Sequence, residues 1–243
     1  MHRKLIAVLV LAICCGLAAA CSSAPAPTQA PQPTVAPVTQ AAPATEAAAA
    51  TAEASTQPAQ ASGARIFVLD PSKTTAHFLV NEVLFGQPKL VDGATGKVEG
   101  QVSADYAHPS AVSVSPVKVD LTGLSTDSQQ RNGMIQRSIL ETDNPANQFA
   151  VFTPAHCDGL PSTVTLGQPF SFKIAGSLAL HGVTKDLTFD TTVTPVSASQ
   201  LSGTASATIV YGDWGVQVLR LPPQVASVED HVILKLDFVA NAS

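Results

Sequence analysis

Disulfide-forming cysteine pairs are missing from the part of this chain that has the composition of a folded domain. The 243 residues hold four cysteines, and two of them, Cys14 and Cys15, lie in an apolar stretch near the N-terminus. Cys21 directly follows that stretch, which leaves Cys157 alone in the remaining sequence. One cysteine excludes an intrachain disulfide there. Stability must therefore come from a hydrophobic core, and Cys157 is predicted to be a small, partly buried residue and not a reactive thiol.

The sequence also lacks a surplus of basic charge and the short motifs of common enzymes. Lys and Arg number 13 against 18 Asp and Glu, and no basic cluster occurs, so nucleic-acid binding is not expected. No G-x-S-x-G elbow, Walker loop or dinucleotide fingerprint is present. Five histidines show no spacing typical of metal ligands: His77, His108, His156, His181 and His231. We therefore predict no metal site, no cofactor and no enzymatic activity.

The first 20 residues have the three parts of a secretory signal peptide. Positive charge at Arg3 and Lys4 precedes an apolar run over residues 5–17 and three alanines at 18–20. This run is shorter than the roughly 20 residues that a transmembrane helix needs. The alanines followed by Cys21 resemble a bacterial lipobox, in which the cysteine is acylated and becomes the mature N-terminus. The alternative is an ordinary signal peptide with a chance cysteine at its end.

After Cys21 the composition changes to that of a disordered tether. Up to residue 63 the chain is mostly Ala, Pro, Thr, Gln and Ser, with Glu46 and Glu53 as its only charges and no aromatic residue. Such a segment cannot bury enough apolar surface to offset the entropy of ordering it. With coil statistics, about 42 residues span roughly 35–40 Å. We therefore expect an extracytoplasmic protein that acylated Cys21 anchors to a membrane and that residues 21–63 tether.

Residues 64–243 have the length of one domain and the patterning of antiparallel strands. Apolar side chains alternate with polar ones over residues 170–180, 187–193 and 231–238, and over 112–121 with a slip in phase at Pro116. His181-Gly182 is typical of a tight hairpin turn between two of these runs. A short helix is predicted over 129–140, where Ile135 and Ile139 share one face. So many strands with so little helix indicate an all-β barrel or sandwich, and a closed barrel would leave no exposed edges.

The domain resembles the YceI-like, or polyisoprenoid-binding, family of exported lipocalin-like barrels over residues 67–240. The hairpin Gly176-Ser-Leu-Ala-Leu-His181-Gly-Val-Thr-Lys185 is its most specific match. The other matching segments are Phe67-Val-Leu-Asp70-Pro-Ser72, Asp120-Leu-Thr-Gly-Leu-Ser-Thr-Asp127 with Arg131-Asn132, Leu140-Glu-Thr-Asp-Asn-Pro145 with Phe149, Gly212-Asp-Trp-Gly-Val216 and Val228-Glu-Asp-His-Val232. The family usually has Asp where this chain has Asn132. The resemblance implies an antiparallel lipocalin-like barrel of about eight strands with one or two short helices.

The resemblance also implies that the barrel holds an isoprenoid or another amphiphilic lipid. Candidates for the walls of such a lumen are Phe78, Val80, Phe172, Ile174, Phe189, Tyr211, Leu234 and Phe238. Sequence alone leaves open whether these residues line an open lumen or fill a packed core. Arg131 and His181 are candidates for contact with a lipid head group, because a guanidinium pairs well with phosphate. A helix-surface role for Arg131 and a simple turn role for His181 are the alternatives.

Three functions are compatible with these features. The first is a non-enzymatic lipoprotein that binds or carries a lipid. The second is a surface interaction module with a solid core, which would expose a large apolar patch. The third is an enzyme acting on a lipid in the barrel, which would need titratable side chains converging inside the lumen. A homodimer is a further hypothesis.

Overall fold

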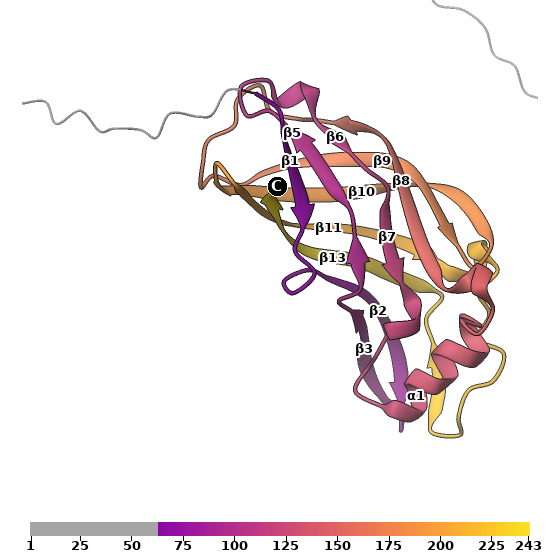
Figure 1. Cartoon of the computed structure of the whole chain (residues 1–243). Helices are drawn as coiled ribbons and strands as arrows, with labels where there is room; N and C mark the ends of the chain where they lie inside the picture. Colours follow the sequence, from indigo (N-terminus) through magenta and orange to yellow (C-terminus); the bar gives the residue numbers. More distant parts are fainter. Residues whose placement is uncertain (1–62) are drawn as a thin grey trace, which may run out of the picture. The chain divides into compact units, whose positions relative to one another are not determined.

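Thirteen strands form one hydrogen-bonded sheet in residues 63–243, the part of the chain that the computed structural model describes (Figure 1). The predicted signal peptide, Cys21 and the tether lie outside the described residues and stay predictions. The strands are β1 (Arg65–Leu69), β2 (Thr75–Leu84), β3 (Gln87–Thr95), β4 (Val98–Glu99), β5 (Gln101–Ala104), β6 (Ser113–Val114), β7 (Val117–Asp120), β8 (Phe149–Asp158), β9 (Phe170–Leu180), β10 (Val183–Ser197), β11 (Gln200–Val210), β12 (Val225–Val228) and β13 (His231–Ala242).

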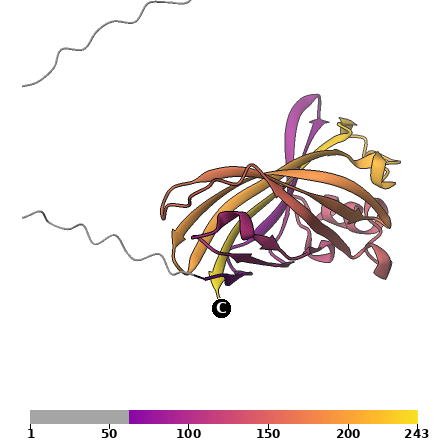
Figure 2. The ribbon, with the colours of Figure 1, turned by 90° about the horizontal axis from the view of Figure 1, so that it is seen from above.

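These thirteen pieces occupy eight positions around a curled sheet (Figure 2). Four of these positions are occupied by one interrupted strand each, because its segments pair with the same neighbours. The interrupted strands are β1 with β2, then β3 with β4 and β5, then β6 with β7, and finally β12 with β13. The ends of the sheet meet where Val98 pairs with Val119 and Val102 pairs with Val114. The expected antiparallel lipocalin-like barrel of about eight strands is therefore confirmed. An eight-stranded barrel is just wide enough inside for side chains or one small ligand.

Glycine and proline account for three of the interruptions. Gly96 and Gly100 separate β3, β4 and β5, so this interrupted strand can bend from pairing with β2 to pairing with β1. Pro116 separates β6 from β7, at the position where the sequence predicts a slip in phase. Proline has no N–H to donate to a ladder, so the pairing stops and resumes around it.

Alternation assigns the faces of the long strands correctly. In β9, Phe170, Phe172 and Ile174 line the interior, whereas Ser171 and Lys173 between them are exposed. β9 and β10 are joined by a two-residue turn in which His181 has φ 50° and Gly182 has φ 77°. Positive φ at both positions is the geometry of a type I′ turn, which matches the twist of the flanking strands.

The predicted helix is present in two parts. α1 (Gln129–Met134) begins after Ser128, whose hydroxyl accepts a hydrogen bond from the Arg131 backbone N–H. The turn then widens into the π-helical segment η3 (Ile135–Ile139), where the Leu140 N–H donates to the Ile135 carbonyl. The remaining short helical turns are η1 (Pro109–Ala111), η2 (Leu121–Gly123), η4 (Pro145–Asn147) and η5 (Tyr211–Trp214). None of the helices in the described part is long and apolar enough to cross a bilayer.

Two apolar clusters stabilise the barrel from inside. One surrounds Trp214 and Leu178, and the other surrounds Phe67 and Ala240. The indole N–H of Trp214 donates to the Leu178 carbonyl at 3.1 Å, so this buried ring has its polar atom satisfied. Both clusters and the ladders of these thirteen strands are formed by residues 63–243. The domain therefore contains its own core, and a chain starting at Gly63 keeps all of these contacts.

Candidate functional site

The interior of the barrel holds a cavity of about 410 Å³. Its walls are almost entirely apolar and come from all eight strand positions, from α1 and η3, and from the loop that follows η5. Small residues on the inner face, such as Ala76, Ala150 and Ala205, leave room beside larger neighbours. Cavities of roughly 300–1,000 Å³ with apolar walls and a few polar groups are typical of small-molecule sites.

All eight predicted wall residues contact this cavity: Phe78, Val80, Phe172, Ile174, Phe189, Tyr211, Leu234 and Phe238. They also pack against one another and against the core. The Phe189 ring meets Phe152 edge to face at 4.8 Å between centroids, and Phe170 stacks on Phe172 at 5.8 Å. The same side chains thus belong to the core and bound an open lumen. Contact with a ligand stays a prediction for each of them.

Close packing of one glycine positions the Phe78 ring. A Cβ atom on Gly93 would lie 1.9 Å from Cε1 of Phe78, so the ring lies directly over the glycine on the neighbouring strand. Any larger residue at position 93 would push the ring further into the cavity. Gly93 therefore sets the width of the lumen at this level.

Two groups of lining residues are not among the sequence predictions. Met134, Ile135 and Ile139 reach the cavity from α1 and η3. Val218, Leu221 and Pro222 reach it from the loop between η5 and β12. For the helix the signal is present, since the spacing of Ile135 and Ile139 predicts that they share a face. The loop is rich in apolar residues but lacks the alternation of a strand, so its sequence does not indicate which side chains point toward the cavity.

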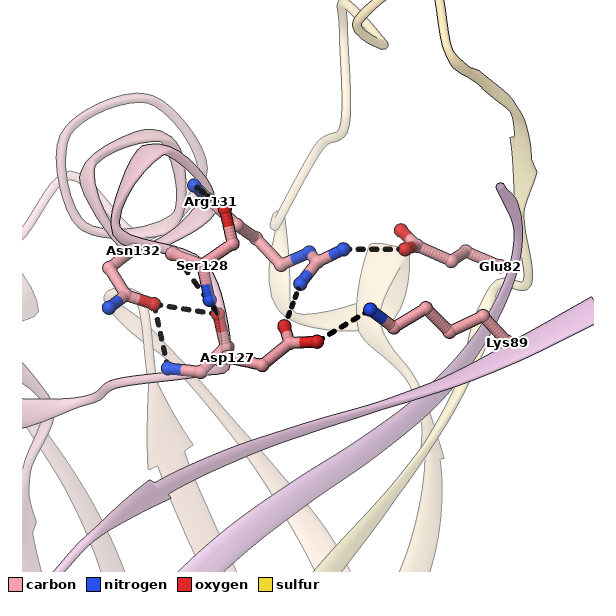
Figure 3. Close-up of polar contacts among 7 residues, drawn as sticks. Glu82, Lys89, Asp127, Ser128, Arg131 and Asn132 are labelled. Atoms are coloured by element: carbon pink, nitrogen blue, oxygen red, sulfur yellow. Dashed lines mark hydrogen bonds and ion pairs between the residues drawn. The ribbon is translucent and has the colours of Figure 1, made fainter. Parts of the chain in front are cut away.

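A charged network joins the start of α1 to β2 and β3 (Figure 3). Glu82 of β2 accepts a hydrogen bond from the Arg131 guanidinium at 2.6 Å, and its side chain is only 5% exposed. Arg131, 17% exposed, also pairs with Asp127, which in turn accepts from the Lys89 ammonium at 2.5 Å. The hydrogen bond from Lys89, together with the Arg131 charge, lowers the pKa of Asp127 below its usual value. Glu82 and Arg131 both line the cavity.

This network decides what Arg131 can offer a ligand. Two carboxylates, Glu82 and Asp127, balance the two cations Arg131 and Lys89. An anionic head group would have to compete with both carboxylates for the guanidinium. Arg131 therefore reaches the cavity, as a head-group contact must, but with its charge already compensated. The neighbouring Asn132 side chain stabilises the start of the helix instead, because its Oδ1 accepts hydrogen bonds from the backbone N–H and hydroxyl of Thr126 at 2.7 Å each.

His181, the other head-group candidate, does not line the cavity. It lies in the β9–β10 turn, where a Cβ on Gly215 would be 3.8 Å from its Nδ1. Its Nε2 is buried without a hydrogen-bond partner among the described residues. The structure therefore places His181 beside the η5 turn and outside the lining of the lumen.

Two further polar side chains, those of Thr191 and Tyr106, line the cavity, whereas Cys157 does not. The Thr191 hydroxyl is buried on the lining of β10 and has no partner within residues 63–243. Burial raises the pKa of Tyr106, which lines the cavity, to about 12. Burial also raises the pKa of Cys157, which keeps its thiol protonated and weakly nucleophilic. In the described part of the chain, no three His, Cys, Asp or Glu side chains are placed to hold a metal.

The sequence profile of the YceI-like domain family matches residues 67–240. The chain belongs to the YceI-like family. Solved structures with the same fold include a polyisoprenoid-binding domain from Saccharophagus degradans implicated in plant cell wall breakdown, which is 16% identical, with 73% of this chain and 98% of that chain covered and a TM-score of 0.57. Burkholderia cenocepacia BcnA is 18% identical, with 71% and 99% covered and a TM-score of 0.55. The Campylobacter jejuni YceI protein is 16% identical, with 62% and 84% covered and a TM-score of 0.51. Comparison with curated proteins gave no match.

The likeness to these structures extends over nearly the whole of the first two neighbours. The YceI-like domain of this chain therefore has the family's barrel in full. The motifs that carry the resemblance also have visible structural roles. Asp70 of the opening motif accepts hydrogen bonds from the backbone N–H and hydroxyl of Ser72 and from Asn241, and the Ser72 hydroxyl lowers the pKa of Asp70 most strongly. This motif thus closes the turn after β1 and contacts β13.

Proposed function

We propose that this YceI-like domain binds a long-chain lipid, an isoprenoid or a similar amphiphile, in its barrel without chemically changing it. The observation that carries the proposal is the apolar cavity of about 410 Å³ with a charged network at one end. The neighbour from Saccharophagus degradans, named as polyisoprenoid-binding, has the same fold and supports the same ligand class here. The lining is almost entirely apolar, which supports a binding role over an enzymatic one.

The size of the cavity is enough for useful affinity. At about 30 Å³ for each water-sized group, a cavity of about 410 Å³ takes about a dozen methylene-sized groups. Burying each one contributes about 0.8 kcal/mol, or roughly 10 kcal/mol together before the costs of association. Because Arg131 is already neutralised, the chain of the ligand supplies most of this energy, and its polar group adds orientation at the Glu82–Arg131 end.

Export and anchoring complete the proposal. The signal peptide and acylated Cys21 expected from the sequence would place the barrel outside the cytoplasm, one tether length from a membrane that contains such lipids. Incorporation of labelled palmitate into the full-length chain, and its loss in Cys21→Ser, would support this part. A full-length chain that takes up no palmitate in its bacterial host would overturn it. Sedimentation of the purified domain checks the separate hypothesis of a homodimer.

Lipid extracted from the purified full-length protein tests the binding function. We expect mass spectrometry to find one class of long-chain lipid that is depleted when a bulky residue fills the lumen, as in Ala205→Phe from β11 or Ala150→Phe from β8. Thr204→Phe is the matched control, since residue 204 lies next to Ala205 on the outer face of the same strand and is exposed. Equal lipid content in the folded plug variants and in the control would refute binding in the barrel.

A further inference from the structure

Three exposed apolar side chains gather at one end of the barrel. Phe85, at the tip of the β2–β3 hairpin, is 79% exposed, and Leu219, in the loop between η5 and β12, is 80% exposed. Leu221 of the same loop is 37% exposed. We call Phe85, Leu219 and Leu221 the apolar tip. Figure 1 shows the hairpin and the loop projecting at the same end as α1, whereas β1 begins at the other end.

The hairpin and the loop are joined to each other. The Phe85 backbone N–H donates to the Gln224 carbonyl at 2.8 Å, and Leu84 pairs with Val225 at the start of β12. The apolar tip is therefore a single feature held by backbone hydrogen bonds. Phe85 and Leu219 are the most exposed large apolar side chains of the described residues, so the tip presents them to the surroundings.

Phe85 is an unexpected residue for its position. Its φ is 49° and that of Gly86 is 77°, the backbone of a type I′ turn, in which asparagine is favoured at the first position and bulky residues are rare. The exposed ring gains nothing from burial that would offset this strain. A strained, exposed aromatic residue points to a function outside the folded domain.

The apolar tip is continuous with the lumen. Leu84, Val218, Leu221 and Pro222 line the cavity immediately behind it, so Leu221 belongs both to the tip and to the cavity wall. An apolar path thus runs from the inside of the barrel to its exposed end. The Glu82–Arg131 ion pair lies beside this path. Glu82 precedes Phe85 by three residues along β2, which is about 10 Å in an extended strand.

The charges around the apolar tip favour a lipid surface. Residues 83–88 carry no charge, and residues 215–224 carry only Arg220, which is exposed between Leu219 and Leu221. The two segments themselves therefore carry no carboxylate that lipid phosphates would repel, and the exposed Asp127 near the hairpin is paired with Lys89 and Arg131. Two leucines flanking one arginine can enter the head-group layer while the guanidinium contacts phosphate.

We propose that the apolar tip inserts into the surface of a bilayer and that the lipid ligand enters and leaves the barrel there. This inference rests on the proposed lipid-binding function. A lipid released into water would expose its chain at a cost of about 0.8 kcal/mol per methylene, and docking of the mouth on the membrane avoids this exposure. The tip is the place where the cavity wall reaches the surface as exposed apolar residues.

The test uses the domain starting at Gly63, so that no acyl anchor contributes to membrane binding. The tip variant is Phe85→Asn with Leu219→Gln, because asparagine suits positive φ and both side chains are exposed. The control variant is Val68→Gln with Val196→Gln, which removes two exposed apolar side chains of β1 and β10 (43% and 48% exposed) that do not lie at the tip. Arg220→Gln tests the role of charge.

Three measurements separate the two proposals. Binding of a pyrene-labelled long-chain alcohol, added without vesicles, reports the lumen alone. Flotation with vesicles of phosphatidylcholine, with or without phosphatidylglycerol, and transfer of the same probe between vesicles report the apolar tip. We expect the tip variant to keep vesicle-free binding but to lose about tenfold or more in vesicle partitioning and transfer rate. Arg220→Gln should lose the gain that phosphatidylglycerol gives, and the control should match the native domain.

The outcomes are distinguishable. A native domain that does not bind the probe without vesicles refutes the lipid-binding function itself. A domain that binds the probe while the tip variant partitions and transfers like the native one overturns the membrane-docking proposal and leaves lipid binding intact. Vesicle binding that falls equally in the tip variant and the control also overturns it, since exposed apolar residues anywhere on the domain would then suffice.

Discussion

Replacing Arg131 by methionine should strongly destabilise the domain, because it leaves the Glu82 carboxylate buried without the cation that the structure pairs with it. The Glu82 side chain is 5% exposed and the Arg131 side chain 17% exposed. Removing one partner of a buried ion pair costs about 3–5 kcal/mol. Taking the lower end, a loss of about 3 kcal/mol lowers the Tm of a domain of this size by roughly 6–12 °C.

The double variant Glu82→Met with Arg131→Met should recover most of this loss, because two apolar side chains of similar length leave no buried charge. Asp127→Asn is the comparison for the exposed part of the network. The Asp127 side chain is 59% exposed, so its loss should cost far less than the loss of Arg131, because solvent screens an exposed ion pair. The three variants thus separate the buried pair from the solvent-exposed one.

Urea unfolding followed by Trp214 fluorescence measures these differences. Trp214 is the one tryptophan of the chain, and it is buried in the core with its indole N–H bonded to Leu178. A cost below about 1 kcal/mol for Arg131→Met would refute the reasoning. A double variant no more stable than Arg131→Met would refute it as well. In both cases water would stabilise the Glu82 carboxylate in the absence of Arg131, despite the small exposed fraction of its side chain.

Three further predictions concern separate features. Gly176→Ala should destabilise the domain by about 3 kcal/mol in the same urea assay. The new Cβ would lie 2.3 Å from the Thr153 carbonyl oxygen, a backbone atom that no rotamer change can move. A loss of stability under about 0.5 kcal/mol would contradict this. Cys157 in the domain should react with iodoacetamide at about pH 8 more slowly than the same thiol in urea, because burial raises its pKa; equal rates would contradict it. Because the pKa of Asp127 is lowered, its contribution to stability is present above the unfolded pKa near 3.9 and lost as the pH falls through the folded value. The native and Asp127→Asn domains should therefore differ in Tm at about pH 7 and converge below about pH 3. A difference in Tm that persists or grows at acid pH would contradict a lowered pKa of Asp127.

Alternation along single strands is enough to predict the inner face. The spacing of Phe172, Ile174 and Phe189 assigns them inward, and they line the cavity. The His181-Gly182 turn is equally predictable, because its geometry depends on two adjacent residues. These features are local, and a period of two or a two-residue turn is written directly in the sequence.

Features that depend on distant segments are not predictable in the same way. Glu82 and Arg131 are 49 positions apart and meet only because α1 closes over the end of β2. The openness of the lumen is hidden for a different reason: a filled core and a lined cavity need the same apolar residues on the same faces. Small residues such as Gly93 and Ala205 decide between them, and their effect depends on which side chains lie opposite.

The cavity of the barrel has room for one lipid chain, and the proposed function requires that it holds one. Native mass spectrometry of the domain with a pyrene-labelled long-chain alcohol tests this most directly. We expect one probe per native chain, the same for Thr204→Phe, and loss of the probe from folded Ala205→Phe. A folded Ala205→Phe domain that still carries one probe, or a native domain that carries none, would contradict it.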